Sequence, residues 1–113
     1  MLSVGVKIFK QFDIWLATLN PTVGSEINKT RPCVIISPNE MHWLNTVIIA
    51  PLTTKGIKAP TRVSFIFKGV ENSVALDQIR TVDKTRMIKK LDTIHSSTQK
   101  NISSVLIEMF SLE

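Results

Sequence analysis

Short apolar runs rich in β-branched residues, each closed by a turn signal, are the feature that most constrains the fold of this chain. Such runs are typical of β-strands, and in residues 62–67 apolar and polar side chains alternate as a half-buried strand requires. The predicted strands are Asp13–Leu19, Cys33–Ser37, Thr46–Ala50, Arg62–Phe67 and Ser73–Val82, with a turn at Gly69–Asn72 before the last. The sequence therefore predicts a mainly β fold.

The C-terminal tail changes to a helical period. Apolar residues one helical turn apart form a single stripe, made of Ile102, Val105, Leu106 and Met109. This stripe predicts a C-terminal α-helix from about Thr98 to Leu112. Ser96 followed by Gln99 is typical of a capping box at the helix start, and Asp83 is expected to cap a short turn. Many short strands with one closing helix favour a small β-barrel capped by a helix.

Length and composition indicate one globular domain, residues 1–113, with no metal or disulfide needed to hold it together. The formal charge of +5, from 14 Lys and Arg against 9 Asp and Glu, favours a polyanionic partner such as nucleic acid without requiring one. Met1–Phe12 lacks the apolar centre of a signal peptide, and no run reaches the about 18 apolar residues of a membrane span. We expect a soluble cytoplasmic protein with no membrane association.

The cysteine and the two histidines of the chain do not form a recognisable catalytic or metal-binding motif. Cys33 is the single cysteine and lies in an apolar run, which predicts a buried core thiol. His42 is expected to pack within a loop, and His95 to face solvent just before the helix. No cluster of Asp, Glu, His and Cys has metal-ligand spacing, so neither a metal nor another cofactor is expected.

The segment Pro21–Pro32 joins two apolar strands and is long for a hairpin connection. Long loops in small domains are often functional. Arg31 lies against Pro32 at the strand entrance, so its backbone should be rigid while its guanidinium reaches outward to grip a phosphate at two points. A solvated loop with an isolated arginine explains the same residues.

Two further segments combine polar groups with strand ends. Thr53, Thr54 and Lys55 follow the predicted strand Thr46–Ala50 and could bind phosphate or a ribose hydroxyl, although threonine is also a common turn residue. Asp77 and Gln78 interrupt the apolar strand Ser73–Val82. Because neighbouring strand residues point to opposite faces, one of the two should face the interior or a cleft. The alternative is that these side chains bind loop backbone.

In this order, these segments resemble the MazF/PemK (Kid-like) family of toxins. The resemblance covers most of the chain, and the matching segments are Asp13–Leu16, Asn20–Glu26, Lys29–Pro38, Ala50–Lys55 and Val74–Asp83. It implies an SH3-like small β-barrel with a C-terminal helix, assembled as a homodimer with single-stranded RNA lying across the subunit interface. It also implies a ribosome-independent mRNA interferase that a small antitoxin protein neutralises.

The resemblance assigns roles to particular residues. Arg31 and Thr53 match the family's catalytic pair, and Glu26 is the nearest carboxylate that could act as the base. The residues expected to bind or orient RNA are Ser25, Lys29, Thr54, Lys55, Asp77 and Gln78.

This sequence also departs from the family pattern. Phe12 stands where glycine usually precedes the first strand, so the entry into that strand is expected to differ. Ser25 and Ala75 stand where some relatives have His and Arg. A mechanism that uses those two side chains cannot be carried over.

Together these residues predict metal-independent cleavage, in which the ribose 2′-OH attacks the adjacent phosphorus and leaves a 2′,3′-cyclic phosphate and a 5′-OH. Arg31 would stabilise the added phosphoryl charge, and Thr53 would orient a phosphate oxygen or the 2′-OH. Two alternatives remain. One is a gyrase poison of the CcdB type, which has the same fold, although the chain lacks that type's C-terminal tryptophan. The other is a basic RNA-binding barrel without catalysis.

Overall fold

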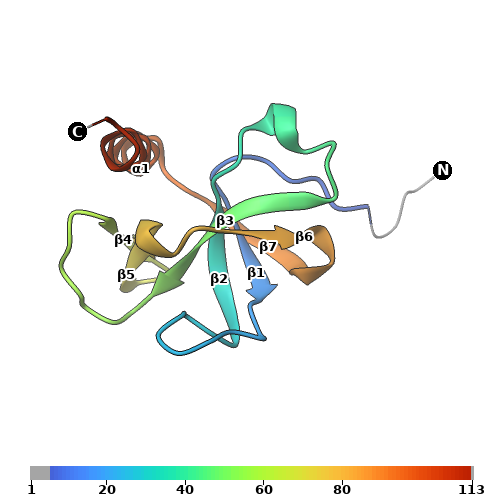
Figure 1. Ribbon diagram of the computed structural model, residues 1–113, viewed down its shortest axis with the longest axis horizontal. Helices are drawn as coiled ribbons and strands as arrows, with labels where there is room; N and C mark the ends of the chain where they lie inside the picture. Colours follow the sequence, from blue (N-terminus) through green and yellow to red (C-terminus); the bar gives the residue numbers. More distant parts are fainter. Residues whose placement is uncertain (1–5, 113) are drawn as a thin grey trace.

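A curled antiparallel sheet with a single helix at its C-terminal end forms the part of the chain that the computed structural model describes, residues 6–112 (Figure 1). The first five residues of Met1–Phe12, the segment expected not to be a signal peptide, lie outside this range. The strands are β1 Asp13–Thr18, β2 Thr30–Ile35, β3 Thr46–Thr53, β4 Arg62–Phe67, β5 Val70–Ala75, β6 Arg80–Asp83 and β7 Met87–Thr93. Short 3₁₀ turns span Asn39–Met41, Leu76–Gln78 and Lys84–Arg86, and helix α1 spans Ser96–Met109. The mainly β prediction is confirmed.

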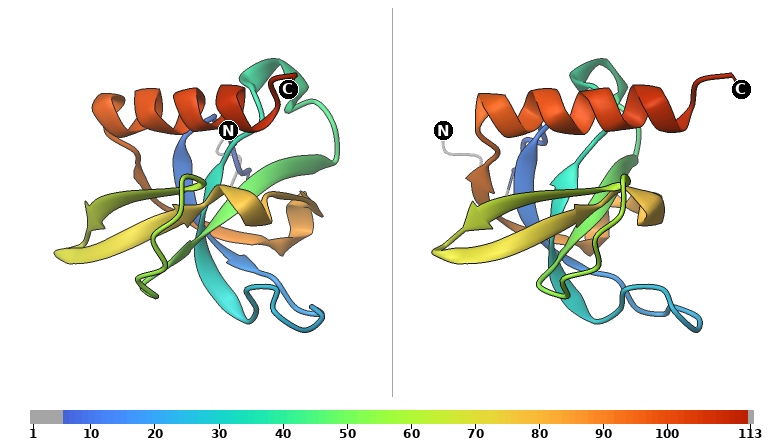
Figure 2. Two further views of the ribbon diagram at one scale, coloured as in Figure 1. Left: turned by 60° about the vertical axis from the view of Figure 1, so that its left-hand side comes forward. Right: turned by 90° about the vertical axis from the view of Figure 1, so that its left-hand side faces the viewer.

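The strands follow the order β4-β5-β3-β2-β1-β7, and β6 pairs with β3. Strand β3 curls the sheet because it changes partner along its length. Its first half, Thr46–Ile49, pairs with β6, and its last two residues, Leu52 and Thr53, pair with β5. The other edge of β3 pairs with β2. The result is a half-barrel with α1 lying across one side and the β1–β2 loop projecting from the other (Figure 2).

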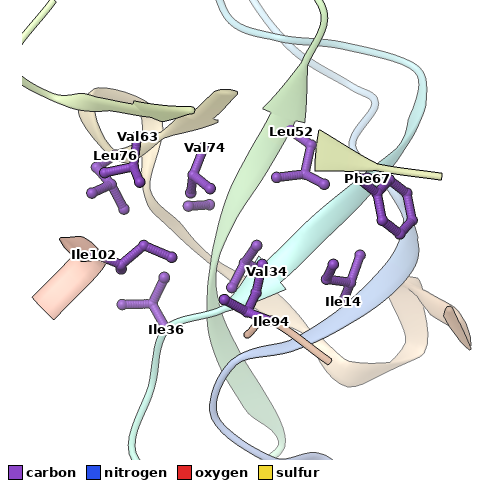
Figure 3. Packing of buried hydrophobic residues seen from close by; sticks show 11 residues of the cluster. Ile14, Val34, Ile36, Leu52, Val63, Phe67, Val74, Leu76, Ile94 and Ile102 are labelled. Carbon is purple, nitrogen blue, oxygen red and sulfur yellow. The ribbon is translucent and has the colours of Figure 1, made fainter. Parts of the chain in front are cut away.

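Both faces of the central strands are buried. The helix-side cluster consists of Ile14, Val34, Ile36, Ala50, Leu52, Val63, Phe67, Val74, Leu76, Ile94 and Ile102 (Figure 3). The far-side cluster consists of Phe9, Trp15, Ala17, Leu19, Cys33, Ile35, Val47, Ile49, Val82 and Met87. Successive residues alternate between them, as Ile14 and Trp15 do in β1. Because both faces of these strands are buried, their sequences are nearly continuous apolar runs. Each fully buried large side chain stabilises the fold by about 1.5–3 kcal/mol.

Several predicted boundaries are wrong. The predicted strand Ser73–Val82 is two strands, β5 and β6, because the chain turns at Leu76–Gln78 to bury Leu76 in the helix-side cluster. Strand β3 continues past its predicted end at Ala50, with Pro51 opposite Cys33. Strand β2 begins at Thr30 rather than Cys33 and ends at Ile35.

The hairpin turn and the last strand also differ from the prediction. The turn between β4 and β5 is the pair Lys68 and Gly69 rather than Gly69–Asn72, with φ of 51° and 76°. Both residues are left-handed, as a two-residue type I′ hairpin requires. Strand β7 was not predicted, because it is an edge strand whose side chains are mostly exposed and charged.

Helix α1 begins two residues before its predicted start and ends three before its predicted end. The predicted capping box is wrong. His95 holds the N-cap position without a side-chain cap, and Gln99 Nε2 donates instead to the carbonyl of Ile94 at 2.8 Å. The predicted Asp83 cap is confirmed, since the Thr85 N–H donates to Asp83 Oδ1 at 2.9 Å.

Phe12 adopts a left-handed backbone, with φ of 69°. Its N–H donates to the carbonyl of Ile35 at 2.8 Å, and its carbonyl accepts from the N–H of Ile94 at 2.9 Å. The structure therefore shows a left-handed phenylalanine at the entry into β1, held by backbone hydrogen bonds on both sides. Phe12 takes the conformation that glycine adopts freely, at a cost of about 1–2 kcal/mol, while its ring packs against the helix-side cluster.

The predictions for the three reactive side chains are confirmed. Cys33 is fully buried, and this burial raises the pKa of its thiol to about 12. His42 fastens a loop, since its Nδ1 lies 2.7 Å from the carbonyl of Phe9 and its Nε2 lies 2.9 Å from Ser37 Oγ. His95 is exposed. Within the described part of the chain, no helix is long and apolar enough to cross a membrane.

Candidate active site

The loop between β1 and β2 is tied down at its base and at its middle. At the base, the Leu19 N–H donates to the carbonyl of Lys29 at 2.8 Å, and the Lys29 N–H donates to Asn20 Oδ1 at 3.1 Å. At the middle, the Ile27 N–H donates to Gln78 Oε1 at 2.7 Å. Gln78 therefore binds loop backbone, as the alternative interpretation of its sequence position held. These hydrogen bonds hold the loop beside the start of β2 and the end of β3.

Arg31 is the second residue of β2, where it lies opposite Ala17 of β1. Its Nε–H donates to the carbonyl of Asn28 at 3.1 Å, which fixes the plane of the guanidinium. The four N–H groups on its two terminal nitrogens remain available. No carboxylate of residues 6–112 forms an ion pair with Arg31. The side chain is therefore an oriented cation whose charge is not neutralised locally.

Thr53 is the last residue of β3. Strand β3 pairs with β2, the strand that carries Arg31. The β2–β3 register ends with Cys33 opposite Pro51. Arg31 and Thr53 each lie two residues beyond this last pair, and both line the same cleft. The Lys55 N–H donates to Thr53 Oγ1 at 3.1 Å, which leaves the hydroxyl proton free to be donated.

A cleft of about 350 Å³ contains both residues. It is lined by Gly24, Ser25, Glu26, Ile27, Asn28, Arg31, Thr53, Lys55, Ile57, Arg62 and Gln78. It brings together most of the side chains that the sequence singled out, from the β1–β2 loop, two strand ends and the 3₁₀ turn after β5. Its cations are Arg31, Lys55 and Arg62, whereas Glu26 is the only carboxylate among the lining residues.

A second cleft, of about 540 Å³, adjoins the first and shares four lining residues with it: Ser25, Glu26, Ile27 and Gln78. Asp77 and Arg80 line this second cleft, together with apolar groups from Pro21 and Ile79. The two clefts lie on either side of these shared residues along the β1–β2 loop and are together called the groove. Two of the predicted RNA-binding residues, Lys29 and Thr54, line neither cleft; Thr54 lines a smaller hollow beside Thr53.

Glu26 lies at the junction of the two clefts. Its Oε1 accepts a hydrogen bond from the Val23 N–H at 2.6 Å, which turns one carboxylate oxygen back toward its own loop. Its second oxygen takes no hydrogen bond from the described residues. That oxygen is the one able to accept a proton from a bound molecule.

Asp77 lines the second cleft, as expected of one of the pair Asp77 and Gln78, and its carboxylate binds Arg62. The Arg62 Nε–H donates to Asp77 Oδ1 at 2.6 Å, the terminal Nη2 donates to Oδ2 at 3.0 Å, and Thr61 Oγ1 donates to Oδ1 at 3.1 Å. The hydrogen bond from Arg62 holds the pKa of Asp77 below its usual value. Asp77 also lies in a 3₁₀ turn rather than a strand, so the face alternation assumed for it does not apply.

Arg62 is the lining residue that the sequence reasoning missed. It is the first residue of β4, two residues after Pro60, and Arg31 is the second residue of β2, so an arginine near a proline at a strand entrance was a signal common to both. Arg62 was not selected, because it fits the polar side of an ordinary alternating strand, residues 62–67.

Comparisons with known proteins identify the family of this chain. Residues 10–110 match the model of a family described as the PemK-like, MazF-like toxin of type II toxin-antitoxin systems. The chain is 32% identical over 106 residues to the endoribonuclease MazF of Staphylococcus epidermidis, and 35% identical over 106 residues to that of Staphylococcus saprophyticus. Each match covers 88% of this chain and 88% of the relative.

The fold is that of solved MazF structures. MazF from Deinococcus radiodurans superposes with a TM-score of 0.83 at 18% identity, covering 95% of this chain and 100% of that one. A mycobacterial endoribonuclease, solved in complex with its cognate antitoxin, has a TM-score of 0.77 at 21% identity and covers 92% of this chain and 96% of that one. With the family model spanning most of its length, the chain belongs to the PemK-like, MazF-like toxins of type II toxin-antitoxin systems.

Proposed function

We propose that this protein is an endoribonuclease that cuts single-stranded RNA within the groove, by attack of a ribose 2′-OH on the adjacent phosphorus. The observation that carries the proposal is that Arg31, Thr53 and the Glu26 carboxylate line one cleft. The staphylococcal relatives, named as endoribonucleases, support the class of reaction. The proposed reaction uses no metal or other cofactor, because side chains supply the proton acceptor and the charge stabilisation and solvent supplies the proton for the leaving group.

The chemistry needs a proton acceptor, stabilisation of charge on the phosphoryl oxygens, and a proton for the leaving group. The bond from the 2′-oxygen to phosphorus forms as the bond from phosphorus to the 5′-oxygen breaks. The terminal nitrogens of Arg31 bind the non-bridging oxygens, and Thr53 donates its hydroxyl proton to one of them. The free oxygen of Glu26 takes the 2′-OH proton, and the 5′-oxygen leaves as a hydroxyl with a proton from solvent.

The remaining groove residues hold the RNA strand. Ser25, Lys55 and Gln78 lie within the cleft and contact the nucleotides that flank the cut. Lys29 and Thr54 lie outside it and contact the strand as it enters or leaves. Asp77 lines the adjoining cleft and helps to orient the groups that bind RNA. Unstacked bases can be recognised there by their edges, which gives the enzyme its choice of sequence.

The partners follow from the same proposal. A mycobacterial endoribonuclease is known in complex with its cognate antitoxin, and the Deinococcus protein as a MazE–MazF complex. We propose that this toxin is likewise held inactive by a small antitoxin protein. We further propose that it acts as a homodimer on mRNA in the cytoplasm.

The decisive test is cleavage of labelled single-stranded RNA in the presence of EDTA, with the product ends analysed. We expect 2′,3′-cyclic phosphate and 5′-OH ends. Cleavage of an all-deoxy strand, or a strict metal requirement, would rule out the 2′-OH mechanism. Inhibition of gyrase supercoiling without any RNA cleavage would support the CcdB-type alternative, and RNA binding without cleavage would support the non-catalytic barrel.

The role of Arg31 is tested by Arg31→Ala. Loss of one preorganised donor to the reacting phosphoryl group commonly lowers the rate by about 10²–10³. We expect that loss with an unchanged unfolding transition, because no carboxylate in residues 6–112 depends on Arg31 for an ion pair. Wild-type activity in this variant would remove Arg31 from the mechanism. Lys100→Gln, which removes one exposed charge from α1 outside both clefts, is the charge-matched control.

A further inference from the structure

Arg62 lines the same cleft as Arg31 and Thr53, yet the proposed chemistry gives it no part. It is the first residue of β4, and the β4–β5 register places it directly opposite Ala75. Because alanine ends at Cβ, the arginine side chain can extend past it to reach Asp77 in the turn that follows β5. Its side chain is only 7% exposed. A guanidinium is seldom buried to that extent without a specific partner.

Asp77 fixes the orientation of that guanidinium. The carboxylate accepts from Nε and from one terminal nitrogen, at 2.6 and 3.0 Å, which is the two-point geometry that leaves arginine little freedom to rotate. Two of the five N–H donors are used in this way, and three remain. No side chain or carbonyl of the described residues accepts from those three. They are therefore available to a molecule bound in the cleft.

A purely structural role for the ion pair is poorly supported, because the turn that carries Asp77 is anchored by other contacts. The Leu76 N–H donates to the carbonyl of Thr61 at 3.1 Å, and the Leu76 side chain is fully buried in the helix-side cluster. Asp77 itself retains 36% exposure of its side chain. The pair is buried on the Arg62 side, so it also contributes to stability, and the unfolding measurements described below separate that contribution from RNA binding.

We propose that Arg62 is a second phosphate-binding residue of the groove, and that Asp77 is the positioning residue that orients it. This rests on the proposed function in so far as the ligand is single-stranded RNA. Arg31 binds the phosphate that is cut, and Arg62 binds a neighbouring phosphate of the same strand.

The first experiment measures binding, not cleavage. The probe is a mixed-sequence single-stranded 2′-O-methyl RNA, which has no free 2′-OH and so is not cut by the proposed chemistry. Its affinity is measured from low to high salt for wild type, Arg62→Gln and the control Lys100→Gln. Removing one side chain that binds a phosphate of a single strand lowers the slope of log affinity against log salt by about 0.7. We expect this decrease, and about tenfold weaker binding, for Arg62→Gln alone.

A slope for Arg62→Gln equal to that of wild type would overturn the proposal, as would an equal decrease for Lys100→Gln. Failure of the wild-type protein to bind the probe would also overturn it. If wild-type protein binds the probe but cuts no RNA, the proposed function is refuted. The role of Arg62 is then still decided by the slope of log affinity against log salt. If Arg62→Gln does not fold, Arg62→Lys keeps the charge without the two-point geometry. Wild-type cleavage by that variant would overturn the proposal.

A double-mutant cycle tests the role given to Asp77. If Asp77 acts by orienting Arg62, Asp77→Asn lowers cleavage in the wild-type background and has no further effect in the Arg62→Gln background. If Asp77 contacts RNA directly, its loss lowers cleavage equally in both backgrounds, and its assignment as a positioning residue fails. A role in stability alone would change the unfolding free energy of both single variants without changing the salt slope of either.

Discussion

The left-handed backbone of Phe12 allows a sharp test of the fold, because it predicts a reversal of the usual order of alanine and glycine. Phe12→Ala and Phe12→Gly both remove the same ring from the helix-side cluster. They differ only at Cβ, which is unfavourable at a φ of 69° and absent in glycine. At an ordinary φ, alanine is the more stable of the two by about 0.5–1 kcal/mol.

The magnitude follows from two opposing effects. A side chain in the left-handed region costs about 1–2 kcal/mol, which Phe12→Ala retains and Phe12→Gly removes. Against this, glycine loses about 0.5–1 kcal/mol more in chain entropy on folding. We expect Phe12→Gly to be more stable than Phe12→Ala by about 0.5–1 kcal/mol. Both variants should be less stable than wild type, since a partly buried aromatic ring contributes on the order of 2 kcal/mol.

The assay is urea unfolding followed by tryptophan fluorescence, with midpoints compared at a common slope. Phe110 provides the matched control, because it is an exposed phenylalanine with an ordinary φ of −108°. There, the alanine variant should be at least as stable as the glycine variant. If Phe12→Ala proves as stable as Phe12→Gly, or more stable, the assignment of strain to position 12 is incorrect.

Three further predictions concern side chains around the groove and core. Cys33 should resist thiol reagents in the folded protein at pH 8 and react once urea unfolds it, because burial raises its pKa to about 12; rapid labelling of folded protein would contradict this. Arg62 lowers the pKa of Asp77, so the pair stabilises the fold above the ordinary carboxyl value of 3.8 and loses this effect as the pH falls. The stability difference between wild type and Asp77→Asn should therefore shrink toward acid pH, and a difference that stays constant would refute the assignment. Gln78→Met should cost about 1 kcal/mol and speed hydrogen exchange at the Ile27 amide, which loses its acceptor; unchanged exchange there would show that Gln78 does not hold the loop.

Local patterns predicted the strands that alternate between two buried faces and the helix with an apolar stripe. They failed where tertiary contacts determined the outcome. Leu76 looks like one more strand residue, but its burial bends the chain into a turn and divides the predicted strand in two. Strand β7 was missed because an exposed edge strand can tolerate the charges of Lys89 and Lys90, which hide its pattern.

The site was predictable to a similar extent. Arg31 and Thr53 could be selected because each is a polar group at the end of an apolar run, and the family resemblance joined them. Their meeting in one cleft depends on the pairing of β2 with β3, which no local pattern determines. The Arg62–Asp77 pair was not predicted, because it joins two segments whose proximity arises only when β4 and β5 form their hairpin.

The β2–β3 register has a consequence for how this protein tolerates insertions and deletions. Because a hydrogen-bonded ladder, rather than the connecting segment, sets the pairing of Cys33 with Pro51 near the two groups, an insertion at the exposed residues 38–40 should leave Arg31 and Thr53 in place. One residue inserted between Arg31 and Cys33 would instead turn the guanidinium to the opposite side of its strand. A chain altered in that way could keep its core, and its shape, while losing its toxicity altogether.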